Sequence, residues 1–101
     1  MNERITVMVE SDLEDLVPGF LENRRKDVAR IEALLVGRDF DALRKIGHSL
    51  KGVGGGYGFD PITDLGATIE QAALQQDDAT IRDACQRLAD YLDRVDVVFT
   101  D

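Results

Sequence analysis

Cysteine and histidine are almost absent from this chain, with one residue of each among 101. The single cysteine, Cys85, cannot form an intrachain disulfide, which is typical of a protein from a reducing compartment. No apolar run approaches the roughly 20 residues that a membrane helix needs, and the first residues lack the apolar stretch of a signal peptide. These absences predict a soluble cytoplasmic protein with no place in a membrane.

Positive charge is also scarce, since 12 basic side chains stand against 20 acidic ones and the formal net charge is -8. Nucleic acids and anionic membranes require a basic protein surface, so neither is expected as the main partner. The apolar fraction of 44% and the charged fraction of 32% are typical of a globular protein. At this length the chain is expected to form one compact domain and not a large enzyme.

Apolar residues recur every three or four positions along most of the chain, which is the helical period. Turn signals divide this pattern into four stripes, over residues 17–35, 40–57, 62–73 and 81–99. Four amphipathic helices joined by short loops predict an all-α fold, an antiparallel four-helix bundle that occupies residues 11–101.

Residues that begin and end helices agree with these four stripes. Carboxylates that can act as N-caps precede the last three: Asp39, Asp60 with Pro61 after it, and Asp77 or Asp78. Gly37 and Gly58 fit the left-handed residue that often closes a helix.

The first ten residues are expected to form an extended arm. Residues 4–10 alternate apolar and polar side chains like a strand, but no second strand is predicted to pair with them. Next, Ser11 and Asp12 can cap a short helix to about Val17, and Pro18 would bend the chain into the first long helix. An arm lying on the bundle is the expectation, and edge pairing between two chains is the alternative.

Six glycines lie in the segment IGHSLKGVGGGYG, which runs from Ile46 to Gly58. Inside a helix each glycine costs about 0.8–1 kcal/mol relative to alanine, so the five before Gly58 would cost about 4–5 kcal/mol. The apolar spacing nevertheless continues to Tyr57 and favours a helix over a loop. The helix is therefore expected to need bare backbone, for close packing or for contact with a partner.

His48 is expected to face solvent, because the apolar positions of its helix lie about 140–220° away at about 100° per residue. Within about 60° of it lie one acid, three cations and two glycines: Asp41, Arg44, Lys45, Lys51, Gly52 and Gly55. Nearby cations disfavour the imidazolium form and keep a nucleophilic nitrogen available, and Lys51 could contact phosphoryl oxygens. The arrangement suits a phosphoryl group that another protein presents across the flat glycine surface.

Motifs that are missing narrow the chemistry further. The chain has no Walker loop, no dinucleotide fingerprint and no acidic cluster that could hold magnesium beside His48. Zinc is disfavoured because Cys85 lies on a core stripe, and Ser49 has no third residue to complete a hydrolase triad. We expect no cofactor of its own and no ability to take a phosphoryl group from ATP unaided.

His48, Leu50, Lys51, Gly52 and Gly58 match the signature H-x-L-K-G-x-x-x-x-x-G, and over about residues 12–99 the chain resembles histidine-containing phosphotransfer (HPt) domains. The resemblance implies that His48 accepts a phosphoryl group from an aspartyl-phosphate on a receiver domain and passes it to another receiver. It also implies that Lys51 assists the phosphoryl oxygens, that Gly52 gives room for docking, and that the receiver supplies magnesium. Such a protein carries phosphate but is not an enzyme with kinase activity.

The charge is unevenly distributed along the chain. Residues 21–51 hold eight basic and five acidic side chains, a local charge of +3, whereas the remainder carries -11. The region around His48, with Arg44, Lys45 and Gly55 as docking residues, is therefore complementary to an acidic receiver pocket. The expected partners are response-regulator receivers or a hybrid histidine kinase. Two alternatives stay open: a docking module that carries no phosphate, and the N-terminal phospho-accepting segment of a chemotaxis-type kinase.

Overall fold

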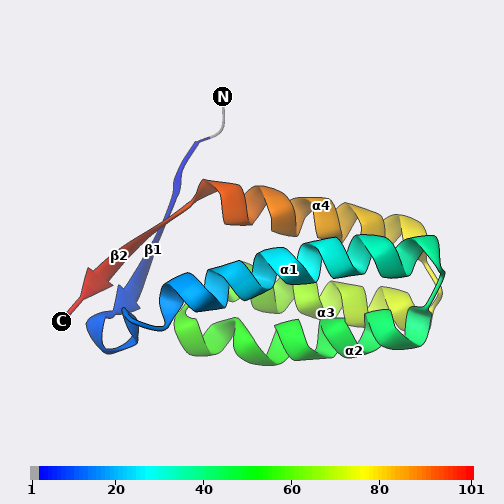
Figure 1. Ribbon diagram of the computed structural model, residues 1–101, viewed down its shortest axis with the longest axis horizontal. Helices are drawn as coiled ribbons and strands as arrows, with labels where there is room; N and C mark the ends of the chain where they lie inside the picture. Colours follow the sequence, from blue (N-terminus) through cyan, green and yellow to red (C-terminus); the bar gives the residue numbers. More distant parts are fainter. Residues whose placement is uncertain (1–2) are drawn as a thin grey trace.

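The computed structural model of the protein describes residues 3–101, and four helices lie side by side in it (Figure 1). These are α1 (Val17–Val36), α2 (Phe40–Val53), α3 (Asp60–Leu74) and α4 (Asp78–Arg94). Short connections turn the chain back between each helix and the next (Figure 1). The prediction of a mostly helical fold with four helices is confirmed. None of the helices described is both long and apolar enough to cross a membrane.

Each helix contributes its apolar stripe to one central core. The residues with no exposed surface come from all four helices and include Ile31, Leu43, Ile69 and Leu88. The closest packing in the bundle is between α2 and α3, and α4 packs against α1 and α3. The helix that carries His48 is therefore fixed mainly by α3.

A parallel strand pair joins the two ends of the chain, and the all-α prediction is wrong in this respect. β1 (Ile5–Glu10) pairs with β2 (Val95–Thr100), with Ile5 opposite Val95 and Glu10 opposite Thr100. The expected arm thus has a partner strand within the same chain. The fourth helix ends at Arg94 instead of continuing to residue 99, because the β-branched run that follows suits a strand better than a helix.

Side-chain contacts hold the residue before β1 to the end of α4 and the start of β2. The guanidinium of Arg4 donates to the carboxylate of Asp96 at 2.8 and 3.1 Å and to the carbonyl oxygens of Asp93 and Val95 at 2.7 and 3.2 Å. Val9 is only 2% exposed and belongs to the main core. The strand pair is therefore part of the packed structure.

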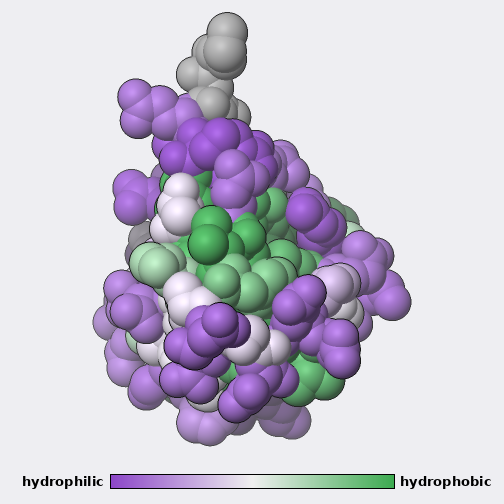
Figure 2. Space-filling model, turned by 90° about the vertical axis from the view of Figure 1, so that its left-hand side faces the viewer, coloured by the Kyte–Doolittle hydropathy of each residue, from purple (hydrophilic) through white to green (hydrophobic). Residues whose placement is uncertain are grey.

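The same end of the molecule carries an apolar patch within a largely polar surface (Figure 2). Met8 and Val98 face each other across the strand pair and are 66% and 46% exposed. The inward side chains of the pair, such as Val9 and Val95, are buried instead. The alternation read from residues 4–10 therefore separates a buried face from an exposed one.

The predicted N-caps agree with the structure at two helices out of three. Asp39 accepts a hydrogen bond from the Ala42 amide at 3.1 Å, and Asp77 accepts one from the Thr80 amide at 3.2 Å. At α3 the prediction was wrong by one position, because Asp60 lies in the first turn of the helix. The residue at the N-cap position is Phe59, which makes no side-chain cap hydrogen bond.

Only one of the two glycines predicted to close a helix is left-handed. Gly58 has φ of 88°, as expected, but Gly37 has φ of -82° and the left-handed residue after α1 is Arg38, with φ of 54°. The hydrogen bonds from Arg38 and Asp39 to the carbonyls of Leu35 and Leu34 close that helix one residue later than predicted.

Two further helix boundaries differ from the sequence interpretation. The short helix expected from Ser11 to about Val17 is a single 3-10 turn, Ser11–Leu13, before α1 begins. The helix expected to reach Tyr57 ends at Val53, and a second 3-10 turn, Gly55–Tyr57, follows it. Tyr57 still packs inward, because its ring stacks on Phe20 of α1 at 4.2 Å between centroids.

Candidate functional site

His48 lies near the middle of α2 and points away from the core. Its side chain is 71% exposed, whereas its helix neighbours Ile46, Gly47 and Leu50 are buried. This agrees with the placement of the imidazole opposite the apolar stripe. The histidine is therefore accessible to another protein without any change in the fold.

A carboxylate that the sequence interpretation missed holds the imidazole ring. The Oε2 atom of Glu70, on α3, lies 2.8 Å from Nδ1 of His48, and Oε1 lies 3.4 Å from Nζ of Lys51. The Glu70 side chain is only 16% exposed. The hydrogen bond with His48 lowers the pKa of Glu70, and the bond from Lys51 acts in the same direction against partial burial. Glu70 is thus an ionised partner that orients both predicted site residues.

This contact determines which ring nitrogen is available for chemistry. A neutral imidazole carries a hydrogen on only one of its two ring nitrogens. An ionised carboxylate beside Nδ1 favours the tautomer that has this hydrogen on Nδ1. The lone pair is then on Nε2, which makes no hydrogen bond within residues 3–101. The ring presents a nucleophilic nitrogen to solvent.

The two other cations predicted at the site, Arg44 and Lys45, are paired with an acid on the same helix. Arg44 and Lys45 both contact the carboxylate of Asp41, at 3.3 and 3.2 Å. The hydrogen bonds from Lys45 and then Arg44 lower the pKa of Asp41. Asp41 and Glu70 therefore neutralise part of the positive charge around His48, and of these two carboxylates only Asp41 was expected there.

Backbone contact between α2 and α3 places Glu70 beside His48. A Cβ atom on Gly47 would lie 2.5 Å from the Glu70 amide nitrogen and 2.9 Å from the Gly66 carbonyl oxygen. A Cβ atom on Gly66 would overlap the Lys51 amide nitrogen. The two helices can approach this closely only because both positions are glycine. Gly47 was one of the glycines expected to need bare backbone, but its counterpart Gly66 was not identified.

The remaining glycines near His48 fall into two groups. A Cβ on Gly54 would lie 2.7 Å from the Thr63 amide nitrogen, so this glycine is needed for packing on α3. Apart from the adjoining residues and the local helix backbone, no heavy atom lies within 4 Å of the Cβ position on Gly52 or Gly56, and a Cβ on Gly55 would touch only the Thr63 hydroxyl at 3.6 Å. Gly52 and Gly55 therefore leave an open, side-chain-free surface beyond His48.

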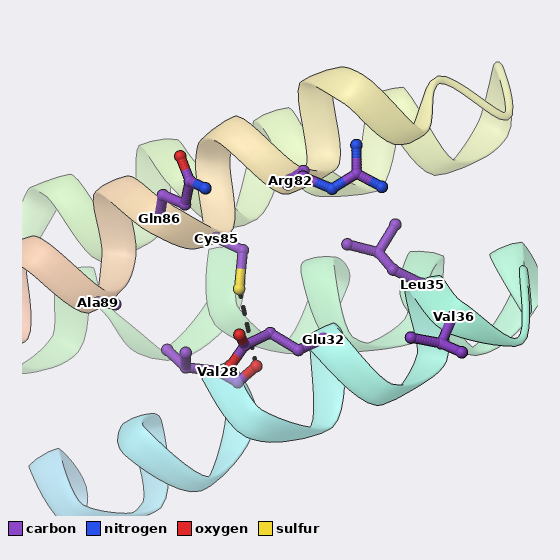
Figure 3. A pocket seen from close by; sticks show the side chains of 8 residues that line it. All are labelled: Val28, Glu32, Leu35, Val36, Arg82, Cys85, Gln86 and Ala89. Atoms are coloured by element: carbon purple, nitrogen blue, oxygen red, sulfur yellow. Dashed lines mark hydrogen bonds between the residues drawn. The ribbon is translucent and has the colours of Figure 1, made fainter.

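The single cysteine lies at a separate place in the bundle. It borders a hollow of about 370 Å³ between α1 and α4 (Figure 3). The thiol of Cys85 donates to the Val28 carbonyl oxygen at 3.6 Å, and burial raises its pKa to about 11. A thiol held in this way is a poor nucleophile and behaves as a small buried hydrophobic group. No group of three or more potential metal ligands occurs among the residues described.

These features define a helical-bundle protein with one exposed histidine, oriented by a carboxylate on the neighbouring helix. Comparison with known families gives a match to the Hpt domain over residues 15–97, and the chain belongs to this family. Searches of curated proteins and of solved structures find no significant match. Hpt domains act in histidine phosphotransfer in two-component signalling, where they are carriers and not kinases.

Proposed function

We propose that this protein is a cytoplasmic phosphorelay carrier, in which His48 accepts a phosphoryl group from a receiver aspartyl-phosphate and passes it to a second receiver. The observation that carries the proposal is the exposed Nε2 of His48, with Glu70 held 2.8 Å from Nδ1 on the opposite side of the ring. Membership of the Hpt family supports the same function.

In the accepting step the Nε2 lone pair attacks phosphorus while the bond to the aspartyl oxygen breaks, and the electron pair leaves on the receiver's carboxylate. Nδ1 keeps its hydrogen, so positive charge develops on the ring as the nitrogen–phosphorus bond forms. The Glu70 carboxylate faces that charge and stabilises it without any proton transfer. The reverse sequence returns the phosphoryl group to the aspartate of a second receiver.

Lys51 is suited to a second role in the same step. Its Nζ atom lies 3.4 Å from Glu70, and its side chain is 51% exposed, so it can turn to the phosphoryl oxygens when these arrive. Magnesium and the acidic residues that bind it are expected on the receiver. Gly52 and Gly55 supply the docking surface, with Arg44 and Lys45 at its edge.

The test is transfer from a purified phosphorylated receiver to the wild-type protein and to two variants. The wild type should gain an acid-labile, base-stable phosphoryl group, and His48→Gln should gain none. Gln86→Ala, at an exposed position on α4 beside the separate hollow between α1 and α4, is the control and should be labelled like the wild type. Equal labelling of His48→Gln would refute the proposal. Receiver binding and full signalling output that persist in His48→Gln would instead support a docking module that carries no phosphate.

A further inference from the structure

A small basic hollow lies between α1 and α2, beside the helix face that carries His48. Its volume is about 220 Å³, and its charged lining consists of three cations and one acid: Arg24, Arg30, Lys45 and Asp27. Sites for small organic ligands are typically about 300–1,000 Å³, so this hollow fits a single side chain better than a cofactor.

The position of the hollow connects it to the acceptor. Lys45 and Ser49 both line it, and on the helix they lie about 60° and 100° from His48 on the same side, at about 100° per residue. The hollow therefore begins where the exposed face of α2 meets α1. A protein docked over His48 and extending toward α1 would cover it.

The cations of the hollow are only partly neutralised within the chain. The side chain of Arg24 is 14% exposed. Its guanidinium carbon lies over the Phe20 ring, 4.8 Å from the ring centroid, and this cation–π contact holds the side chain in place. Its Nε atom lies 2.9 Å from Asp27 Oδ2, but the geometry is not that of a hydrogen bond. Arg30 forms no ion pair within residues 3–101. Arginine donors thus remain available at a site that is already ordered.

We propose that this hollow binds a carboxylate side chain of the receiver that exchanges phosphoryl groups with His48, and that the contact selects the receiver. The inference rests on the proposed function and adds a partner-recognition site to it. A guanidinium presents paired donors that match the two oxygens of a carboxylate, and Arg24 is held in place before the partner arrives. Because the site lies beside the reacting nitrogen and not on it, its effect is on docking.

The test compares two charge reversals on the exposed surface. Arg30→Glu changes the hollow, and Arg82→Glu is the control, since Arg82 lies on α4 at the separate hollow between α1 and α4 (Figure 3). Arg82 also forms no ion pair within residues 3–101. The donor is the receiver that labels wild-type His48 fastest among the purified receivers of the source organism.

The KM for the phosphorylated receiver is here the receiver concentration at half the maximal single-turnover labelling rate. For Arg30→Glu this KM should rise about tenfold or more with little change in the maximal rate, and its salt dependence should weaken. Arg82→Glu should keep the wild-type KM. Arg24→Lys keeps the charge but removes the paired donors, so a smaller rise is expected. Circular dichroism of each variant confirms that it is folded before kinetics are measured.

A charge exchange gives the sharpest result. When each exposed Asp and Glu of the receiver is changed to Arg in turn, one variant should transfer to Arg30→Glu faster than to the wild type. A wild-type KM for Arg30→Glu, or the same rise in Arg82→Glu, would overturn the inference while labelling of His48 continued to support the proposed function. Failure of the wild type to accept label on His48 from any receiver would overturn both.

Discussion

Replacing Gly47 by alanine adds one methyl group at the point where α2 and α3 touch. The new Cβ would lie 2.5 Å from the Glu70 amide nitrogen, 2.9 Å from the Gly66 carbonyl oxygen and 3.0 Å from the Glu70 Cα. All three atoms belong to the backbone, so no side-chain rotation can relieve the overlap. An ordinary contact of 3.4 Å requires the two backbones to separate by about 0.9 Å at this point.

The free energy of unfolding should fall by about 1–2 kcal/mol, because overpacking costs about 1–3 kcal/mol and the better helix propensity of alanine returns less than about 1 kcal/mol. Gly52→Ala is the matched control in the same helix, since no atom outside the adjoining residues and the local helix backbone lies within 4 Å of its Cβ position. That variant should be stabilised by up to about 1 kcal/mol. Urea unfolding followed by circular dichroism measures both differences.

Gly47→Ala should also slow the labelling of His48. A separation of about 0.9 Å would lengthen the 2.8 Å contact between His48 and Glu70 beyond ordinary hydrogen-bond length. The rate of phosphoryl transfer should therefore fall even in conditions where the variant is fully folded. A Gly47→Ala protein as stable as Gly52→Ala, with wild-type transfer, would refute the account of the close helix contact.

Two further substitutions test other parts of the structure. Glu70→Gln should slow phosphoryl transfer and reduce stability at neutral pH. The folded pKa of Glu70 is lowered from 4.5, so its contribution is complete above that value and is lost as the pH falls through the lowered folded pKa. Urea unfolding should show a lower free energy of unfolding for Glu70→Gln than for the wild type at neutral pH but not at acid pH. An equal difference in the free energy of unfolding at both pH values would contradict the ion pair. Val9→Ala should cost about 2 kcal/mol, because the side chain is 2% exposed, whereas Met8→Ala, at 66% exposed, should change stability by less than about 0.5 kcal/mol. Equal effects at the two positions, measured by urea unfolding, would mean that β1 does not pack on the core.

Features encoded by neighbouring residues could be predicted from the sequence. The exposure of His48 follows from the apolar spacing within a single helix, and the caps Asp39 and Asp77 follow from the residues just after them. Such features depend only on the residue spacing within one helix or at its ends. They do not require knowledge of how two elements meet.

Glu70 could not be predicted in this way, because its place beside His48 depends on the register of α3 against α2. That register is set by Gly47 and Gly66, which lie 19 positions apart in the chain. A search for paired glycines on two predicted helices could have suggested it. The length of α2 was overestimated for a related reason: the spacing to Tyr57 fits a helix, but the glycines between do not favour one.

The strand after Arg94 shows the limit of periodicity most clearly. The positions Leu92, Val95 and Phe99 fit a helix, while Val95, Val97 and Phe99 fit a strand equally well. The choice between them depends on β1, which lies at the other end of the chain. Local spacing therefore left two structures open, and long-range pairing decided between them.

The pairing of β1 with β2 also determines how the protein would respond to a pulling force. The two strands run in the same direction, so the N-terminal side of β1 and the C-terminal side of β2 lie at opposite ends of the ladder (Figure 1). Tension between the two ends of the chain acts along the strands, across hydrogen bonds that lie between them. The bonds are then loaded in shear and resist together, instead of opening one after another like a zipper. In the sequence, the helices that hold His48 and Glu70 lie between the two paired strands. The strand pair would therefore bear the load before the acceptor site does.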